Sequence, residues 1–168
     1  VFQPGDHEDV YGVNLTVAWT LADDLQLKSI TAYRNSKIDT GLAFSAAPSQ
    51  IGDQTVRERD DQLSQEFLLS GKSVDRKLDW VAGAYFLKES IFSDVYLPLS
   101  FAANPDGYDT DSTNDGTNHS YAIYGQGTYQ ITDKFGLVLG GRYSVDKKED
   151  TIHVYANKFF ADLLHRSL

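Results

Sequence analysis

The sequence predicts an all-β protein, with about six strands of an antiparallel up-and-down transmembrane β-barrel arranged as three hairpins. Apolar side chains alternate with small or polar ones over runs of ten residues and more, which is the pattern of a strand with one apolar face. Short and long connections alternate along the chain, and aromatic residues recur eight positions apart on one face. Together these features are typical of barrels that cross a membrane with tilted strands.

Composition narrows the possible functions. The chain of 168 residues carries 15 basic against 24 acidic side chains and contains neither cysteine nor methionine. Nucleic acid is not an expected partner, because phosphate-backbone binding needs a clustered positive face. No run of 18 or more apolar residues is present, which excludes a transmembrane helix. Since the first residue is not methionine, we expect the sequence to be an excerpt or a processed product.

The first predicted hairpin shows the alternation most clearly. Residues 10–21 alternate with period two, and residues 25–38 follow with weaker alternation after a turn at 22–24. One face of 10–21 is apolar and consists of Tyr11, Val13, Leu15, Val17, Trp19 and Leu21. The other face consists of Gly12, Asn14, Thr16, Ala18 and Thr20.

Two further hairpins repeat this unit. Residues 61–70 and 78–90 flank a connection at 71–77, and residues 120–131 and 135–148 flank a turn at 132–134. A seventh strand could begin at 151–156. The faces of 78–90 stay unassigned, because Trp80, Ala82, Ala84 and Phe86 compete with Val81, Gly83, Tyr85 and Leu87.

The connections between hairpins are long, polar and rich in turn-forming residues, at 39–60 and 91–118. In a transmembrane barrel short turns face the periplasm and long loops face the outside, so we expect that orientation here. The aromatic spacing independently supports the transmembrane barrel, because eight residues of a strand tilted by about 40° span roughly 20 Å along the barrel axis, close to the ~25 Å apolar band. The spaced pairs are Tyr11 and Trp19, Tyr121 and Tyr129, and Phe135 and Tyr143.

The stretch "ITDKFGLVLGGRYSVDKK" at 131–148 places an arginine in the middle of a strand whose other face is apolar. A barrel accounts for this arrangement, because the apolar face contacts lipid while Gly136, Gly140, Arg142 and Ser144 face a wet lumen. The alternative is a soluble antiparallel sheet with one covered face, such as a β-sandwich.

Four stretches resemble the barrel strands of TonB-dependent outer-membrane receptors: "LKSITAYR" (27–34), "QLSQEFLLSG" (62–71), "LDWVAGAYFLKE" (78–89) and "YGQGTYQITDKFGLVLGGRYSVDKKE" (124–149). The resemblance implies the outer membrane of a Gram-negative bacterium, a 22-stranded barrel around a plug, and import of a scarce ligand such as a ferric siderophore, cobalamin or a sugar. It also implies coupling to TonB through an N-terminal region that does not match any part of this chain. Residues 1–168 are therefore expected to be a fragment of the barrel domain.

Candidate catalytic and metal sites are weak. Asp106, Asp109, Asp111 and Asp115 lie in the acidic stretch 104–116, but their spacing fails the calcium-loop pattern, because Asn114 occupies the place of the sharp-turn glycine. The histidines at 7, 119, 153 and 165 lack ligand spacing. Gly125 and Gly127 lie inside a predicted strand without a following helix, so we interpret them as strand-packing residues. We expect that the protein is not an enzyme and binds no cofactor, and the sequence identifies no ligand-binding residue.

Three functions remain open. The first is part of the wall and loops of a TonB-dependent importer, in which 91–118 gathers ligand through Phe92, Tyr96, Phe101 and Tyr108. The second is a passive porin-like barrel, and the third is a soluble β-sandwich that binds carbohydrate or protein.

Overall fold

The computed structural model of the chain describes residues 5–42, 54–99 and 108–158, and these residues lie in strands and short turns. The strands are β1 (Gly5–Ala22), β2 (Leu25–Leu42), β3 (Gln54–Ser73), β4 (Leu78–Leu99), β5 (Tyr108–Thr132) and β6 (Phe135–Lys158). The predicted six strands in three hairpins are confirmed. Within the described ranges, no helix has the length and apolar character to span a membrane.

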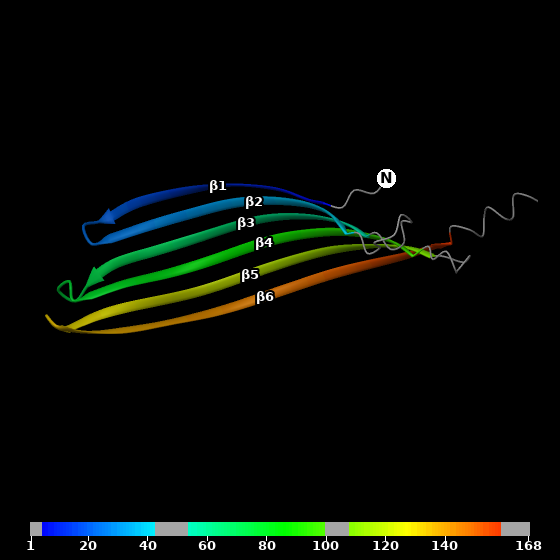
Figure 1. The fold of residues 1–168 in the computed structure, drawn as a ribbon. Helices are drawn as coiled ribbons and strands as arrows, with labels where there is room; N and C mark the ends of the chain where they lie inside the picture. Colours follow the sequence, from blue (N-terminus) through cyan, green and yellow to red (C-terminus); the bar gives the residue numbers. More distant parts are fainter. Residues whose placement is uncertain (1–4, 43–53, 100–107, 159–168) are drawn as a thin grey trace, which may run out of the picture.

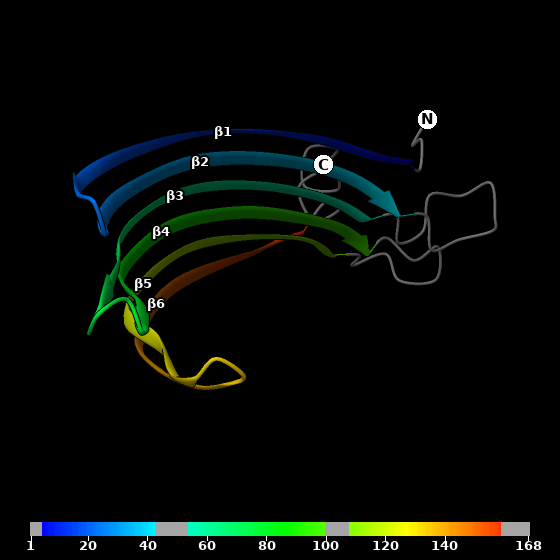
Figure 2. The same ribbon diagram turned by 90° about the vertical axis from the view of Figure 1, so that its left-hand side faces the viewer.

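All six strands form one sheet in the order β1-β2-β3-β4-β5-β6, and each pairs antiparallel with its neighbour in sequence. Figure 1 shows the strands lying side by side, with the three short turns at one end. Turned by 90°, the sheet is clearly curved from β1 to β6 (Figure 2). This is the up-and-down arrangement of a barrel wall, in which consecutive hairpins extend the sheet in one direction.

The strands are longer than predicted, and two predicted loops are largely strand. Residues 39–42 and 54–60 belong to β2 and β3, residues 91–99 to β4, and residues 108–118 to β5. The expected seventh strand at 151–156 is instead the outer part of β6. Sequence reasoning failed here because polar, turn-forming residues can still form strands when their backbone N–H and C=O groups bond to neighbouring strands. The strand β5 is an example, since it pairs with both β4 and β6 from Tyr108 onward. The remaining loop residues, 43–53 and 100–107, lie outside the described ranges.

The three hairpins are staggered relative to one another. Leu25, at the first turn, shares a row of paired residues with Gly71 and Trp80, and β3 runs two residues beyond that row to Ser73. A shift of two residues of ~3.3 Å over two strand spacings of ~4.8 Å corresponds to a strand tilt of about 35°. Figure 1 shows the stagger as turns that reach progressively further from β1 to β6. The value lies in the 35–45° range of transmembrane barrels.

Candidate functional site

The pairing register gives the sheet two chemically distinct faces. Residues directly opposite each other on paired strands point to the same face, so the register carries one face assignment from β1 to β6. The apolar face contains Leu15, Val17, Phe67, Ala84, Ile123, Leu139 and Tyr143, and the polar face contains Thr16, Arg34, Glu66, Glu89, Tyr124, Arg142 and Ser144. Leu139 and Ile123 are 78% and 64% exposed, although both are large and apolar. The described sheet therefore presents most of its uncovered large apolar side chains near the turns on one side, whereas the other side carries the charged network.

The register also settles the faces of β4, which the sequence left open. Ala84 pairs with Phe67 on one side and with Ile123 on the other, so its face is the apolar one. Trp80, Ala82 and Phe86 share that face, and Val81, Gly83, Tyr85 and Leu87 lie on the polar face.

Aromatic rings form two rows on the apolar face. Near the turns lie Trp19, Trp80, Tyr129 and Phe135; further along the strands lie Tyr11, Tyr33, Phe86, Tyr121 and Tyr143. The outer row contains neighbouring rings in contact, because the Tyr11 and Tyr33 centroids are 6.0 Å apart and those of Phe86 and Tyr121 are 5.2 Å apart. Amphipathic rings of this kind mark the two boundaries of an apolar band.

A network of charged and aromatic side chains crosses the polar face at the level of Arg142. The Tyr124 hydroxyl donates a hydrogen bond to the Glu66 carboxylate, which lies two strands away. The Arg142 guanidinium lies over the Tyr124 ring, 5.6 Å from its centroid, and its Nε donates to the Ser144 hydroxyl at 2.9 Å. The tyrosine can extend over β4 because Gly83 leaves room: a Cβ there would come within 2.3 Å of the Tyr124 ring.

Further from the turns, past the level of the outer aromatic row, the polar face carries several polar side chains that make few hydrogen bonds. Asn118 donates to Glu89 at 3.3 Å, while one oxygen of Asp60 and the side-chain oxygens Oδ1 of Asn118 and Asn114 are buried without a hydrogen-bond partner. Burial raises the pKa of the Asp60 carboxyl, and the Glu89 carboxylate raises it further, against the lowering effect of Arg34. This part of the face is therefore rich in hydrogen-bond acceptors.

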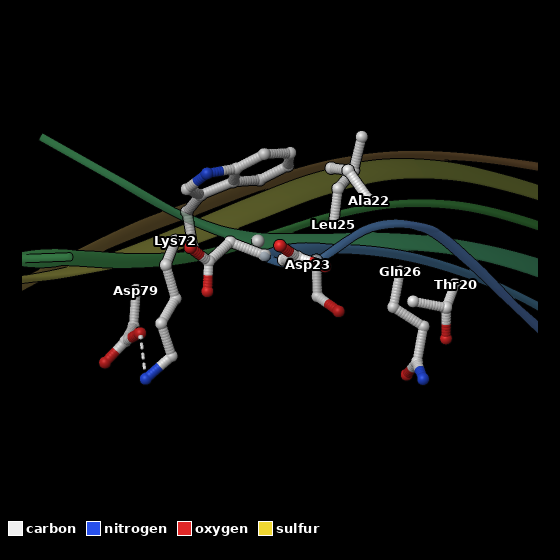
Figure 3. Close-up of a pocket in the computed structure, with 11 residues that line it drawn as sticks. Thr20, Ala22, Asp23, Leu25, Gln26, Lys72 and Asp79 are labelled. Carbon is white, nitrogen blue, oxygen red and sulfur yellow. Dashed lines mark ion pairs between the residues drawn. The ribbon is translucent and has the colours of Figure 1, made fainter. Parts of the chain in front are cut away.

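A shallow hollow of about 420 Å³ lies at the first turn, between the ends of β1 to β4. Figure 3 shows Thr20, Gln26, Lys72 and Asp79 on one side of the sheet and Leu25 on the other. The Lys72 ammonium and the Asp79 carboxylate form an ion pair at 3.3 Å, drawn as a dashed line. These groups are exposed, and no catalytic constellation is present among the residues that line the hollow.

Hydrogen bonds link each turn to the next. Asp24 of the first turn accepts the Lys72 backbone N–H at 3.0 Å, and its carboxylate accepts from the Arg76 guanidinium at 2.6 Å. The Gln130 backbone N–H likewise donates to the Lys77 carbonyl at 2.8 Å. Arg76 and Lys77, in the predicted connection 71–77, therefore link adjacent hairpins.

Comparison with known proteins places the chain in a family. Residues 2–161 match the family model described as TonB dependent receptor-like, beta-barrel. The chain belongs to the TonB-dependent receptor β-barrel family. Its structure is similar to the ferric yersiniabactin uptake receptor FyuA of Yersinia pestis, with a TM-score of 0.75 and 22% identity over 92% of this chain and 23% of that receptor. No curated protein matches the sequence. The chain thus spans about a quarter of the length of FyuA.

Within this receptor wall, the residues singled out from the sequence have the following places. Asp111 and Asp115 lie in β5 rather than in a calcium loop, so the described part of the acidic stretch 104–116 is strand and not a connection between hairpins. Phe92 and Tyr96 lie on β4, and the strand β5 begins at Tyr108. Asp106, Phe101 and His165 lie outside the described residues. Among the residues that are described, no group of three or more His, Cys, Asp or Glu is placed to hold a metal ion.

The network of Glu66 and Tyr124 was not predicted, because its two residues are 58 positions apart and no local pattern joins them. Gly83 was the available signal: a glycine inside a strand marks a close approach by another group.

Proposed function

We propose that this chain is part of the barrel wall of a TonB-dependent importer in the outer membrane of a Gram-negative bacterium. The observation that carries the proposal is the two-faced sheet: one face exposes large apolar side chains between two aromatic rows, and the other carries the Glu66, Tyr124 and Arg142 network. A barrel in lipid needs this division, because a charged side chain on the lipid face near the midplane costs about 2–4 kcal/mol. The wall has no covalent chemistry of its own.

The proposed ligand is a scarce compound such as a ferric siderophore. Support comes from the family match and from FyuA, a ferric yersiniabactin uptake receptor of similar fold. Cobalamin or a sugar is an alternative ligand, and the same barrel wall would serve a receptor for either. A passive porin-like barrel is less well supported, because the family model that matches is one of TonB-dependent receptors. A β-sandwich needs a second packed sheet, and the described strands form one sheet.

Uptake by the full-length receptor tests the function. The receptor is produced in a Gram-negative host that lacks its own siderophore receptors, with and without TonB, and supplied with a panel of radiolabelled ferric siderophores, cobalamin and sugars. We expect uptake of one compound that requires TonB. Uptake that proceeds equally without TonB would indicate a passive barrel, and a receptor that fractionates with soluble proteins would contradict the membrane assignment.

The proposed orientation has the short turns in the periplasm and the opposite ends of the strands outside. Cysteine is introduced at Asp75, in the second turn, or at Asp111, near the far end of β5. An impermeant thiol reagent should label Asp111→Cys on intact cells and Asp75→Cys only after lysis. The reverse pattern would invert the topology.

A further inference from the structure

Three cationic or potentially cationic side chains occupy neighbouring positions on the apolar face of β4, β5 and β6. Lys88 pairs with His119, and His119 pairs with Lys147, so the three side chains point to the same face from adjacent strands. Lys88 and Lys147 are exposed. Among the described residues, neither ammonium group takes part in an ion pair. We call Lys88, His119 and Lys147 the basic triad.

The basic triad lies immediately beyond the outer aromatic row. One row nearer the turns, Phe86 pairs with Tyr121, and the His119 ring stacks against Phe86 with centroids 6.3 Å apart. The Nδ1 atom of His119 is buried without a hydrogen-bond partner. The basic triad therefore lies at the boundary of the apolar band.

An apolar hollow of about 390 Å³ begins directly below the basic triad on the same three strands. Ala84, Tyr121, Ile123, Tyr143 and Val145 line it from the apolar face, over the two rows of pairs next to the triad. Its lining is almost entirely hydrocarbon and aromatic ring. A hollow of this chemistry, open to the side that carries the exposed apolar surface, fits an acyl chain.

We infer that the basic triad and this hollow bind one phosphate-bearing, multi-acyl lipid of the leaflet around the far ends of the strands, with the phosphate at the triad and an acyl chain in the hollow. The inference rests on the membrane location given under the proposed function. Charge supports it: on this face Glu149, one row further out, is the nearest acidic side chain on β4 to β6, and Ser90 and Thr117 beside it are neutral. Each Lys or Arg near an anionic headgroup strengthens such binding.

The corresponding part of β1 to β3 does not carry the same excess of positive charge. Lys37 and Arg59 pair there on the apolar face, but Asp9 pairs with Lys37, and Asp61 lies one row nearer the turns. The Asp61 carboxylate already accepts hydrogen bonds from Tyr33 at 2.5 Å and Asn35 at 2.9 Å. The lipid site is therefore assigned to β4, β5 and β6.

The test measures lipid binding by the full-length receptor in detergent micelles, with bisphosphorylated lipid A as the probe and native mass spectrometry as the readout. Lys88→Gln combined with Lys147→Gln should weaken binding about ten- to thirty-fold. The matched control is Lys148→Gln, which removes the same charge from the adjacent residue on the polar face, and it should bind as the wild type does. Lys88→Arg combined with Lys147→Arg should keep the affinity.

Two further arms identify the source of the phosphate. Lipid A without phosphates should bind the wild-type receptor weakly. Its affinity should be no higher than the affinity of the double glutamine variant for bisphosphorylated lipid A. Inorganic phosphate at millimolar concentration should not displace the lipid; displacement would show a free-phosphate site and overturn the lipid assignment. Equal weakening by Lys148→Gln would also overturn it.

A folding control separates this inference from the proposed function. A barrel that shifts its electrophoretic mobility on heating shows that the variants are folded. A folded receptor that binds the lipid but imports no siderophore contradicts only the proposed function, whereas a receptor that forms no barrel in micelles contradicts both.

Discussion

The Tyr124 hydroxyl on β5 is hydrogen-bonded to the Glu66 carboxylate on β3, and the strand that separates them carries a glycine, Gly83, beneath the tyrosine ring. Arg142 on β6 covers the same ring. Three strands, β3, β5 and β6, are thus connected by side chains on one face of the sheet, and β4 leaves the space for them. In water-exposed positions such contacts contribute little, but a network that satisfies its own polar groups fixes the relative positions of neighbouring strands.

Substitution of Gly83 tests this network. A Cβ at residue 83 would approach the Tyr124 ring to 2.3 Å, so Gly83→Ala should displace the tyrosine and lower the free energy of unfolding by about 1–3 kcal/mol. Urea unfolding of the full-length receptor in vesicles measures the change. Gly125→Ala is the control, because a Cβ there meets only the Val81 carbonyl oxygen at 3.5 Å. Equal effects of the two substitutions would contradict a special role for Gly83.

Opposite faces of β1 should respond differently to charge. Val17 pairs with Ser29 on the apolar face, and Thr16 pairs with Ile30 on the polar face. Val17→Arg should cost about 2–4 kcal/mol, because the guanidinium would enter lipid near the midplane, whereas Thr16→Arg should cost much less. The yield of heat-modifiable barrel in outer membranes compares the two. Similar losses would show that the face assignment of β1 is wrong.

Backbone strain in the second turn gives a stabilising substitution. Val74 has a φ of 55°, a left-handed conformation that β-branched residues rarely adopt. Val74→Asn should raise the free energy of unfolding by about 1 kcal/mol, because asparagine tolerates this conformation. Val74→Ala serves as the control, since it keeps a Cβ without the local hydrogen bonding of asparagine. An asparagine variant no more stable than the alanine variant would rule out the strain argument.

Acidification should partly stabilise the outer part of the wall through Asp60. The pKa of this carboxyl is raised in the folded state above its ordinary value of 3.8, so the folded state holds its proton at pH values where the unfolded state has lost it. Stability therefore falls as the pH rises from 3.8 through the raised pKa. Asp60→Asn removes the titrating group; the groups facing it are Glu89, Arg34 and the neighbouring Asp61.

Unfolding midpoints of wild type and Asp60→Asn, measured from about pH 4 to about pH 7, check this prediction. The asparagine variant should be the more stable protein near pH 7, and the difference should shrink as the pH falls. A difference that grows on acidification would have the wrong sign.

The half of the wall near the turns could be predicted from the sequence because apolar and polar residues alternate regularly there, so each strand's own pattern gives its two faces. The turns at 22–24 and 132–134 and the polar-face position of Arg142 were all predicted, and the register confirms them. The faces of 78–90 could not be predicted because both sets of alternate residues are apolar. Only cross-strand partners such as Phe67 distinguish them.

The outer half escaped prediction because polar and apolar side chains are mixed on both faces there, as in 91–99 and 151–156, so no regular alternation remains. Pairing there is supported by contacts between strands, such as Arg57 with Asp39 at 3.6 Å and with Asp94 at 4.0 Å. The link between Arg76 and Asp24 joins residues 52 positions apart and was equally invisible to local patterns. Long-range partners set the details of the site, and single-sequence periodicity does not contain them.

The strands are far longer than the apolar band requires. β5 and β6 have 25 and 24 residues, while about 9–11 tilted residues cross a bilayer. From Tyr121 in the outer aromatic row, β5 runs on to Tyr108, so at ~3.3 Å per residue the ladder-bonded backbone extends roughly 40 Å along the strand past that row. Single side chains in this extension can therefore be exchanged without any insertion or deletion, because pairing with the neighbouring strands already fixes the position of each residue.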